Sequence, residues 1–265
     1  MWDATSPWPS DMLGYYKNIK VMAGGSLVTV SVNRYRNNDA ASHASAQAAG
    51  TQDAIKVKDA LLGLGAADVM RRAGGAVQYV NVFTGKGSPE AIGAVLATLA
   101  DYAEKFVKKY GGLTYENGYA LKLTADLLGD PALSWQDTLQ AICDEFIGLD
   151  CNGFVGNWLL KADSDLKLTE QSGPGTVKGR GKKKRMHLDE IEEWDVVIWH
   201  GNIHIAAIEQ RGSSPSKFWM CQSAGDGPTK QEYVLTEAAP GVFNKIGGAN
   251  PRAEVGGAVE VYSLW

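Results

Sequence analysis

The stretch "GLDCNGFVGNWL", residues 148–159, places a cysteine directly after an aspartate and before a run of small and apolar residues. Aspartate caps helices by accepting hydrogen bonds from free backbone amides, so Asp150 predicts a helix from Cys151 to about Ala162. The free amides and the dipole at a helix start favour an anion and would stabilise a thiolate there. Cys151 is therefore either a nucleophile or, as free cysteines often are, a small buried apolar residue.

The segments around this stretch predict an α+β fold. Before it, "SWQDTLQAICDEFIGL" (134–149) has helical spacing and a capping serine at its start. After it come a loop rich in Gly and Lys and then runs with the alternation typical of antiparallel strands. These runs are "WDVVIW" (194–199), "IHIAAIEQ" (203–210), "KFWMCQS" (217–223) and shorter strands near 232–236, 241–245 and 258–264.

The N-terminal part of the chain gives three further predictions. Residues 18–36 predict a β-hairpin with a Gly-Gly turn. The segment "AVQYVNVF" (76–83) alternates and predicts a strand. A serine followed by proline at the start of 88–110 predicts a long helix, because serine caps helices and proline fits the first helical position.

A nucleophilic thiol needs a general base, and a histidine is the usual one. His204 opens an apolar strand, which is a rigid platform, whereas His200 lies in the preceding turn. Gln222, on the next strand, could accept a hydrogen bond from the imidazole and hold its productive tautomer, and Ser223 is the alternative for this role. The i,i+4 spacing of the two histidines would suit a metal on a helix, and this segment is a strand, so no metal site is predicted.

At this point the residues resemble a known family. "LDCNGFVGNWL", followed by "EEWDVVIW", "HIAAI" and "FWMCQSA", is similar to the pattern of the NlpC family of cell-wall cysteine peptidases, which are compact relatives of papain. The similarity covers about residues 134–225, roughly a third of the chain. It implies a papain-like, NlpC-type core, in which a cysteine at a helix N-terminus packs on an antiparallel sheet, with an N-terminal α+β extension.

The resemblance also implies roles for single residues. It makes Cys151 the nucleophile, His204 the general base and Gln222 the residue that orients His204. Asp195 matches the aspartate that opens the first strand of the pattern. The chain departs from the pattern in three places. Asn152 stands where the family has serine, and Trp194 stands where it has glycine. The aromatic-glycine-glycine segment, which in the family lies shortly before the cysteine, is found here about forty residues upstream, at Tyr110–Gly112. The residues expected to contact substrate are Asp150, Asn152, Gly153 and Trp199.

Length and composition place limits on these readings. The chain has 265 residues, 45% hydrophobic and 21% charged, which suits one large or two small globular domains. We expect residues 1–87 to form an extension of unknown role and residues 88–265 the catalytic domain. A net charge of −4 does not favour nucleic acid or an anionic membrane, and three cysteines do not make a disulfide framework. Neither a secretory signal peptide nor a transmembrane segment is expected.

The activity implied by the resemblance is hydrolysis of an amide bond in the stem peptides of bacterial peptidoglycan, without metal or cofactor. Such a chain would be made in the cytoplasm and reach the periplasm or cell wall as a phage lysin or as an antibacterial effector, the latter with an immunity protein as partner. The alternatives are a papain-like hydrolase or acyltransferase acting on a lipid ester or a protein, and a non-catalytic binding module. The basic segment 178–185 is either a solvated loop or a site for an anionic partner.

Overall fold

The computed structural model describes residues 6–36, 46–66, 68–225, 227–246 and 257–265. Contacts divide the chain into two compact units, which are Met1–Gly14 with Asp150–Trp265, and Tyr15–Leu149. We call the first the barrel unit and the second the helical unit. Within the described ranges, no helix has both the length and the apolar character needed to span a membrane.

The helical unit begins with a β-hairpin, as predicted, formed by β1 (Ile19–Ala23) and β2 (Ser26–Val30). Gly24 and Gly25 both have positive φ at its turn, a conformation that glycine adopts without steric cost. The hairpin packs on helices, β1 against α5 and β2 against α8. The helices of this unit are α2 (Ala46–Gly63), α3 (Asp68–Arg72), α4 (Ala76–Phe83), α5 (Pro89–Asp101), α6 (Ala103–Tyr110), α7 (Tyr115–Gly129) and α8 (Trp135–Phe146).

The helix predicted over 88–110 is present in two pieces, α5 and α6, which meet at Tyr102. Ser88 accepts a hydrogen bond from the backbone N–H of Ala91 at 3.2 Å, and Pro89 occupies the first turn, as the sequence predicts. By contrast, the segment 76–83 is the helix α4, so the prediction of a strand is wrong.

Tertiary packing explains why α4 is helical. Tyr79, Val82 and Phe83 are fully buried, which is the i, i+3, i+4 spacing of one helix face, whereas Val80 is exposed. The helix packs against α2, α3 and α5. Burial of this face outweighs the preference of valine and aromatic residues for strands, which depends strongly on context.

The two units do not meet at residue 87, where the sequence suggested a boundary. The hairpin at residues 19–30 and the helices α5 and α8 share one core, so residues on both sides of position 87 belong to the helical unit. The chain passes between the units within α1 (Pro9–Lys17) and again between Leu149 and Asp150.

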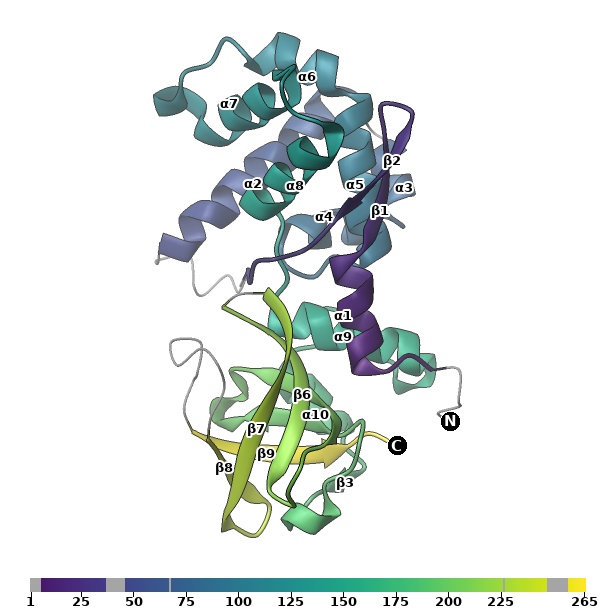
Figure 1. The fold of residues 1–265 in the computed structure, drawn as a ribbon, viewed down its shortest axis with the longest axis vertical. Coiled ribbons are helices and arrows are strands. Elements are labelled where there is room, and N and C mark those ends of the chain that lie inside the picture. Colours follow the sequence, from purple (N-terminus) through teal and green to yellow (C-terminus); the bar gives the residue numbers. More distant parts are fainter. Residues whose placement is uncertain (1–5, 37–45, 67, 226, 247–256) are drawn as a thin grey trace. The chain divides into compact units, whose positions relative to one another are not determined.

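The barrel unit contains an antiparallel sheet in the order β3-β9-β4-β5-β6-β7-β8, in which β8 also pairs with β9. This last pairing closes strands β4 to β9 into a barrel (Figure 1). Helices together with an antiparallel sheet confirm the α+β class predicted from the sequence. The strands are β3 (Lys183–Lys184), β4 (Val196–Trp199), β5 (Ile205–Arg211), β6 (Lys217–Ala224), β7 (Gly227–Ala239), β8 (Val242–Ile246) and β9 (Ala258–Ser263).

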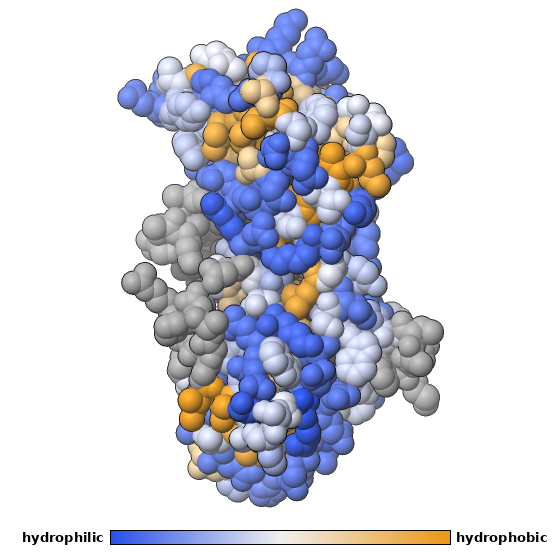
Figure 2. Space-filling view, in the orientation of Figure 1, coloured by the Kyte–Doolittle hydropathy of each residue, from blue (hydrophilic) through white to orange (hydrophobic). Residues whose placement is uncertain are grey.

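Both faces of β5 and β6 are buried, for different reasons. The inward face carries an apolar cluster that includes Ala206, Ile208 and Met220. The outward residues Ala207 and Cys221, which are paired across the two strands, are buried because α9 (Cys151–Ala162) packs on β5 and β6. In the view of Figure 2, most of the surface over β6 and β7 is hydrophilic.

The basic segment 178–185 is not simply a loop. It contains the end of α10 (Pro174–Arg180) and the short strand β3, which pairs with β9. Lys178 and Lys184 both form ion pairs with Glu260 on β9, the second at 2.6 Å. These pairs neutralise part of the positive charge that the sequence displays in this segment.

Candidate active site

Cys151 is the first residue of α9, and Asp150 caps this helix as the sequence predicts. The Asp150 carboxylate accepts a hydrogen bond from the backbone N–H of Gly153. The Asp150 carbonyl accepts another from the N–H of Phe154 at 3.0 Å. The cap fixes where the helix starts and therefore holds the thiol of Cys151 in the first turn, where the helix dipole favours an anion.

The three cysteines differ in exposure. Cys151 is 3% exposed, whereas Cys143 and Cys221 are fully buried. Burial raises the pKa of the Cys143 and Cys221 thiols far above the usual range, and a neighbouring carboxylate, Asp144 or Glu209 respectively, adds to the increase. These two thiols are therefore inert. Cys151 is also buried and differs from them by a small exposed fraction and by its place at a helix start.

Asn152 lies beside the thiol. Cys151 Sγ is 4.0 Å from Asn152 Oδ1, within reach of a weak S–H hydrogen bond to the amide oxygen. Asn152 is half-buried at the second position of the helix, where the resembled pattern has serine. Asn152, which is one of the residues expected to contact substrate, therefore lies next to the candidate nucleophile.

His204 and Gln222 are brought together by the sheet. His204 immediately precedes β5, Gln222 lies on β6, and the pairing of these strands places both side chains on the same face. His204 Nε2 is 2.8 Å from Gln222 Oε1. Ser223, the alternative partner, follows Gln222 on the strand, so its side chain points to the opposite face. Alternation places His204 and Gln222 on the inward face of the barrel, with Ala206 and Met220, whereas α9 packs on the outward face that carries Ala207 and Cys221. The pair and the body of the helix that begins at Cys151 therefore lie on opposite faces of these strands.

A tyrosine fixes the orientation of the Gln222 amide. Gln222 Nε2 donates a hydrogen bond to the hydroxyl of Tyr233, and this hydroxyl donates to Gln231 Oε1 at 2.9 Å. The amide oxygen of Gln222 must then face the imidazole, so His204 Nε2 carries the hydrogen of this bond. This tautomer leaves Nδ1 as the nitrogen that can accept a proton.

The surroundings of His204 keep its imidazole neutral. Burial lowers the pKa of His204 to about 4, the Gln222 hydrogen bond opposes this shift, and the Lys245 ammonium adds to it. The ring of Trp199 packs edge-on against the imidazole, with centroids 4.7 Å apart and planes at 87°. A neutral imidazole is the form that acts as a general base.

Three polar residues around the histidine were not identified from the sequence. They are Tyr233 and Gln231 on β7 and Lys245 on β8, whose ammonium lies 4.5 Å from the centroid of the Tyr233 ring. The pairing of Phe218 with Tyr233 places Tyr233 on the same face of the sheet as Gln222. That pairing depends on the register of β6 and β7, which the alternation within either strand alone does not determine.

The other residues expected to bind substrate have structural partners. Asp150 and Gly153 bond to each other in the cap of α9, and Trp199 is 3% exposed and packs on His204. Their contact with a substrate stays a prediction.

Asp195 is buried and forms a two-pronged ion pair with Arg185, with N–O distances of 2.8 and 2.9 Å. It also accepts a hydrogen bond from the backbone N–H of Glu192 at 2.8 Å, which closes the turn before β4. Within this turn Trp194 has a φ of 74°, in the left-handed region that favours glycine. The resembled pattern has a glycine at this position.

Comparison with protein-family models, with curated proteins and with solved structures finds no match to this chain.

Proposed function

We propose that this chain is a cysteine amidase or peptidase, in which Cys151 attacks an amide carbonyl and His204 acts as general base. The observations that support the proposal are a capped helix that begins at Cys151 and a histidine, His204, that Gln222 orients. The mechanism requires the imidazole, which directly precedes β5, to meet the thiol at that end of the strand. A nucleophile, a base and a residue that orients the base are the three parts that such chemistry needs.

The proposed reaction proceeds in two halves. In the first, His204 Nδ1 takes the thiol proton, and the sulfur of Cys151 bonds to the carbonyl carbon. The C–N bond then breaks, and the imidazolium returns the proton to the leaving amine, which leaves a thioester on Cys151. In the second, His204 takes a proton from water, the hydroxide attacks the thioester, and the carboxylic acid leaves as Cys151 regains its proton.

Two features around the site would assist these steps. The backbone N–H of Cys151, at the start of α9, is the proposed donor to the oxyanion that forms on the carbonyl. Gln222, held by Tyr233, keeps Nε2 protonated, so Nδ1 stays available throughout the reaction.

The proposed substrate is the stem peptide of bacterial peptidoglycan, which follows from the resemblance to the NlpC family. The glycine-like backbone of Trp194, directly before Asp195, supports that resemblance because the family's strand opens with glycine-aspartate. Under this proposal the chain acts at the periplasm or cell wall, as a phage lysin or as an effector whose producer makes an immunity protein.

Digestion of purified sacculi, with the fragments identified by mass spectrometry, tests the proposal. We expect the wild type to release peptide fragments with one new amine and one new carboxyl end, and Cys151→Ala to release none. Cys143→Ala is the matched control, since it removes a buried thiol in the helical unit. Equal release by wild type and Cys151→Ala would exclude the mechanism, and cleavage of a lipid ester or a protein in place of sacculi would exclude the substrate.

A further inference from the structure

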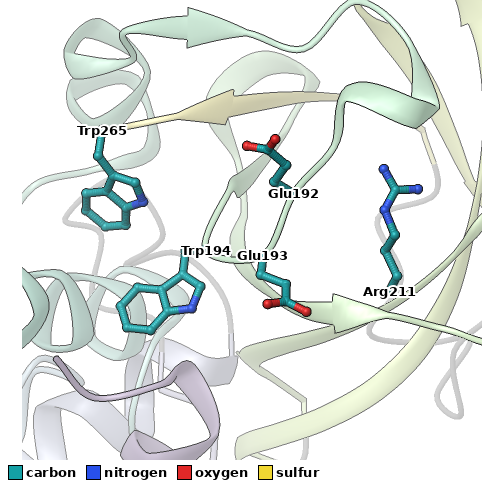
Figure 3. Close-up of a pocket in the computed structure, with 5 residues that line it drawn as sticks. All are labelled: Glu192, Glu193, Trp194, Arg211 and Trp265. Carbon is teal, nitrogen blue, oxygen red and sulfur yellow. The ribbon is translucent and has the colours of Figure 1, made fainter. Parts of the chain in front are cut away.

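The barrel unit contains a second site, at the far end of its strands from His204. It is an open hollow of about 400 Å³ lined by Glu192, Glu193, Trp194, Arg211 and Trp265 (Figure 3). His204 precedes the first residue of β5 and Arg211 is the last, so about 20 Å of extended strand separates the two. The hollow is therefore distinct from the candidate active site.

The backbone of Trp194 points to a use for this hollow. Its φ of 74° lies in the left-handed region, which is unfavourable for a residue with a bulky side chain. The ladder holds it in this conformation, since the N–H of Trp194 donates to the carbonyl of Ile208 at 2.9 Å. Strained residues of this kind cluster at functional sites, and glycine at this position would remove the strain. The strained residue carries the indole that lines the hollow, so the fold keeps this side chain in spite of the strain.

Two indoles form the apolar wall. Trp194 and Trp265 lie with ring centroids 6.1 Å apart and planes at 69°, and both also pack on Trp158. Figure 3 shows both rings on one side of the hollow, with the charged side chains across from them. An indole face carries negative charge density, which attracts the polarised C–H groups on the face of a sugar ring.

The opposite wall offers both acceptors and a donor. Glu192 is exposed and pairs with Arg185 at 2.6 Å, while Glu193 is exposed and has no hydrogen bond or ion pair with any described residue. The Arg211 guanidinium is fixed by hydrogen bonds to backbone carbonyls, two of which are those of Asp189 at 2.7 Å and Ile191 at 2.6 Å. The Arg211 guanidinium is therefore held in place before a ligand binds, and the Glu193 carboxylate is available to accept hydrogen bonds from the ligand.

This mixture of charges favours a neutral ligand. An anion would meet two carboxylates, and a cation would meet a fixed guanidinium. Hydroxyl groups both donate and accept hydrogen bonds, so a polyhydroxylated ligand satisfies carboxylates and guanidinium together. An aromatic wall facing polar groups, in a hollow within the range of small-molecule sites, suits one or two sugar rings.

We propose that this hollow is a saccharide-binding site, with a sugar face on Trp265 and hydroxyls on Glu193 and Arg211. Trp194 is 3% exposed and packs on Trp8, Trp158 and Trp265, so it supports the ring of Trp265 from behind. The proposal does not depend on the chemistry at Cys151. It rests on the proposed function only in one respect, namely that the saccharide would be the glycan part of the polymer whose peptide part is cleaved.

The test measures binding of the tetramer of N-acetylglucosamine to the full chain carrying Cys151→Ala. Binding is measured by calorimetry and by indole fluorescence. We expect saturable binding at submillimolar to millimolar concentration. Trp265→Ala should weaken it at least ten-fold, and Glu193→Gln, which changes an exposed side chain and leaves the fold intact, several-fold. Trp219→Ala is the matched control, because Trp219 is a half-buried indole of β6 outside the hollow and should leave binding unchanged.

Several outcomes would overturn the site. One is the absence of saturable binding, and another is equal weakening by Trp219→Ala and Trp265→Ala. Saturable binding of putrescine or inorganic phosphate, with none of the saccharide, would show a charged ligand and contradict the proposal. Cleavage of sacculi without saccharide binding would contradict only the saccharide-binding proposal. Saccharide binding without cleavage would contradict only the proposed function.

Discussion

His204 Nε2 and Gln222 Oε1 lie 2.8 Å apart, joined across two neighbouring strands of the barrel. This contact determines which imidazole nitrogen holds the proton, because the other end of the Gln222 amide is committed to Tyr233. The strands fix the position of the base, and the amide fixes its tautomer.

The depressed pKa of His204 makes the stability of the fold depend on pH. The imidazole has a pKa of about 4 in the folded chain and about 6.5 when unfolded, so the unfolded chain binds more protons between these values. The free energy of unfolding therefore decreases as pH falls from about 6.5 towards 4. We expect the loss between pH 7 and pH 5 to be smaller in His204→Asn than in the wild type, measured by urea unfolding. Identical losses in both proteins would contradict a buried neutral imidazole.

Tyr233→Phe removes the hydroxyl that holds the Gln222 amide. The unpaired amide destabilises the fold by about 1–3 kcal/mol. It also frees Gln222 to rotate, so we expect kcat on sacculi to fall roughly ten-fold or more with KM little changed, since the third member of such a triad acts through the histidine. Tyr262→Phe, on β9, is the control and should retain kcat. A Tyr233→Phe enzyme that lost stability yet kept the wild-type kcat would show that Tyr233 has only a structural role.

Asp195→Ala leaves the buried guanidinium of Arg185 without its main partner, since the two side chains are 1% and 6% exposed. Removal of one member of a buried pair costs about 3–5 kcal/mol. Glu232→Ala breaks the more exposed pair with Lys217 in the same unit and should cost at most about 1 kcal/mol. Urea unfolding of both variants measures the difference, and equal costs would show that the Asp195 pair does not hold the turn.

The sequence predicts the features that local chemistry determines. The cap at Asp150, the start of α9 at Cys151, the hairpin at 18–36 and the antiparallel strands all follow from capping residues, turn glycines and alternation. The contact of His204 with Gln222 could be anticipated because both residues lie on strands adjacent in the sequence, which usually pair.

Features that depend on distant partners could not be predicted. Residues 76–83 alternate like a strand, but their neighbours in the helical unit bury a helical face instead. Tyr233 joins the candidate site through the register between β6 and β7, and Lys245 through a further strand. The closure of the barrel by β8 and β9, and the ion pairs of Glu260 with the basic segment, likewise arise from residues far apart in the chain.

The reactivity of Cys151 tests the proposed nucleophile most directly. The folded chain is treated with iodoacetamide at pH 6, and the rate of alkylation of each cysteine is followed by peptide mass mapping. A thiolate supported by the helix start and by His204 should make Cys151 react far faster than Cys143 and Cys221, and His204→Ala should slow it at least ten-fold. Alkylation of Cys151 no faster than that of Cys143 and Cys221, or a rate unchanged by His204→Ala, would contradict the assignment of Cys151 and His204 as nucleophile and base.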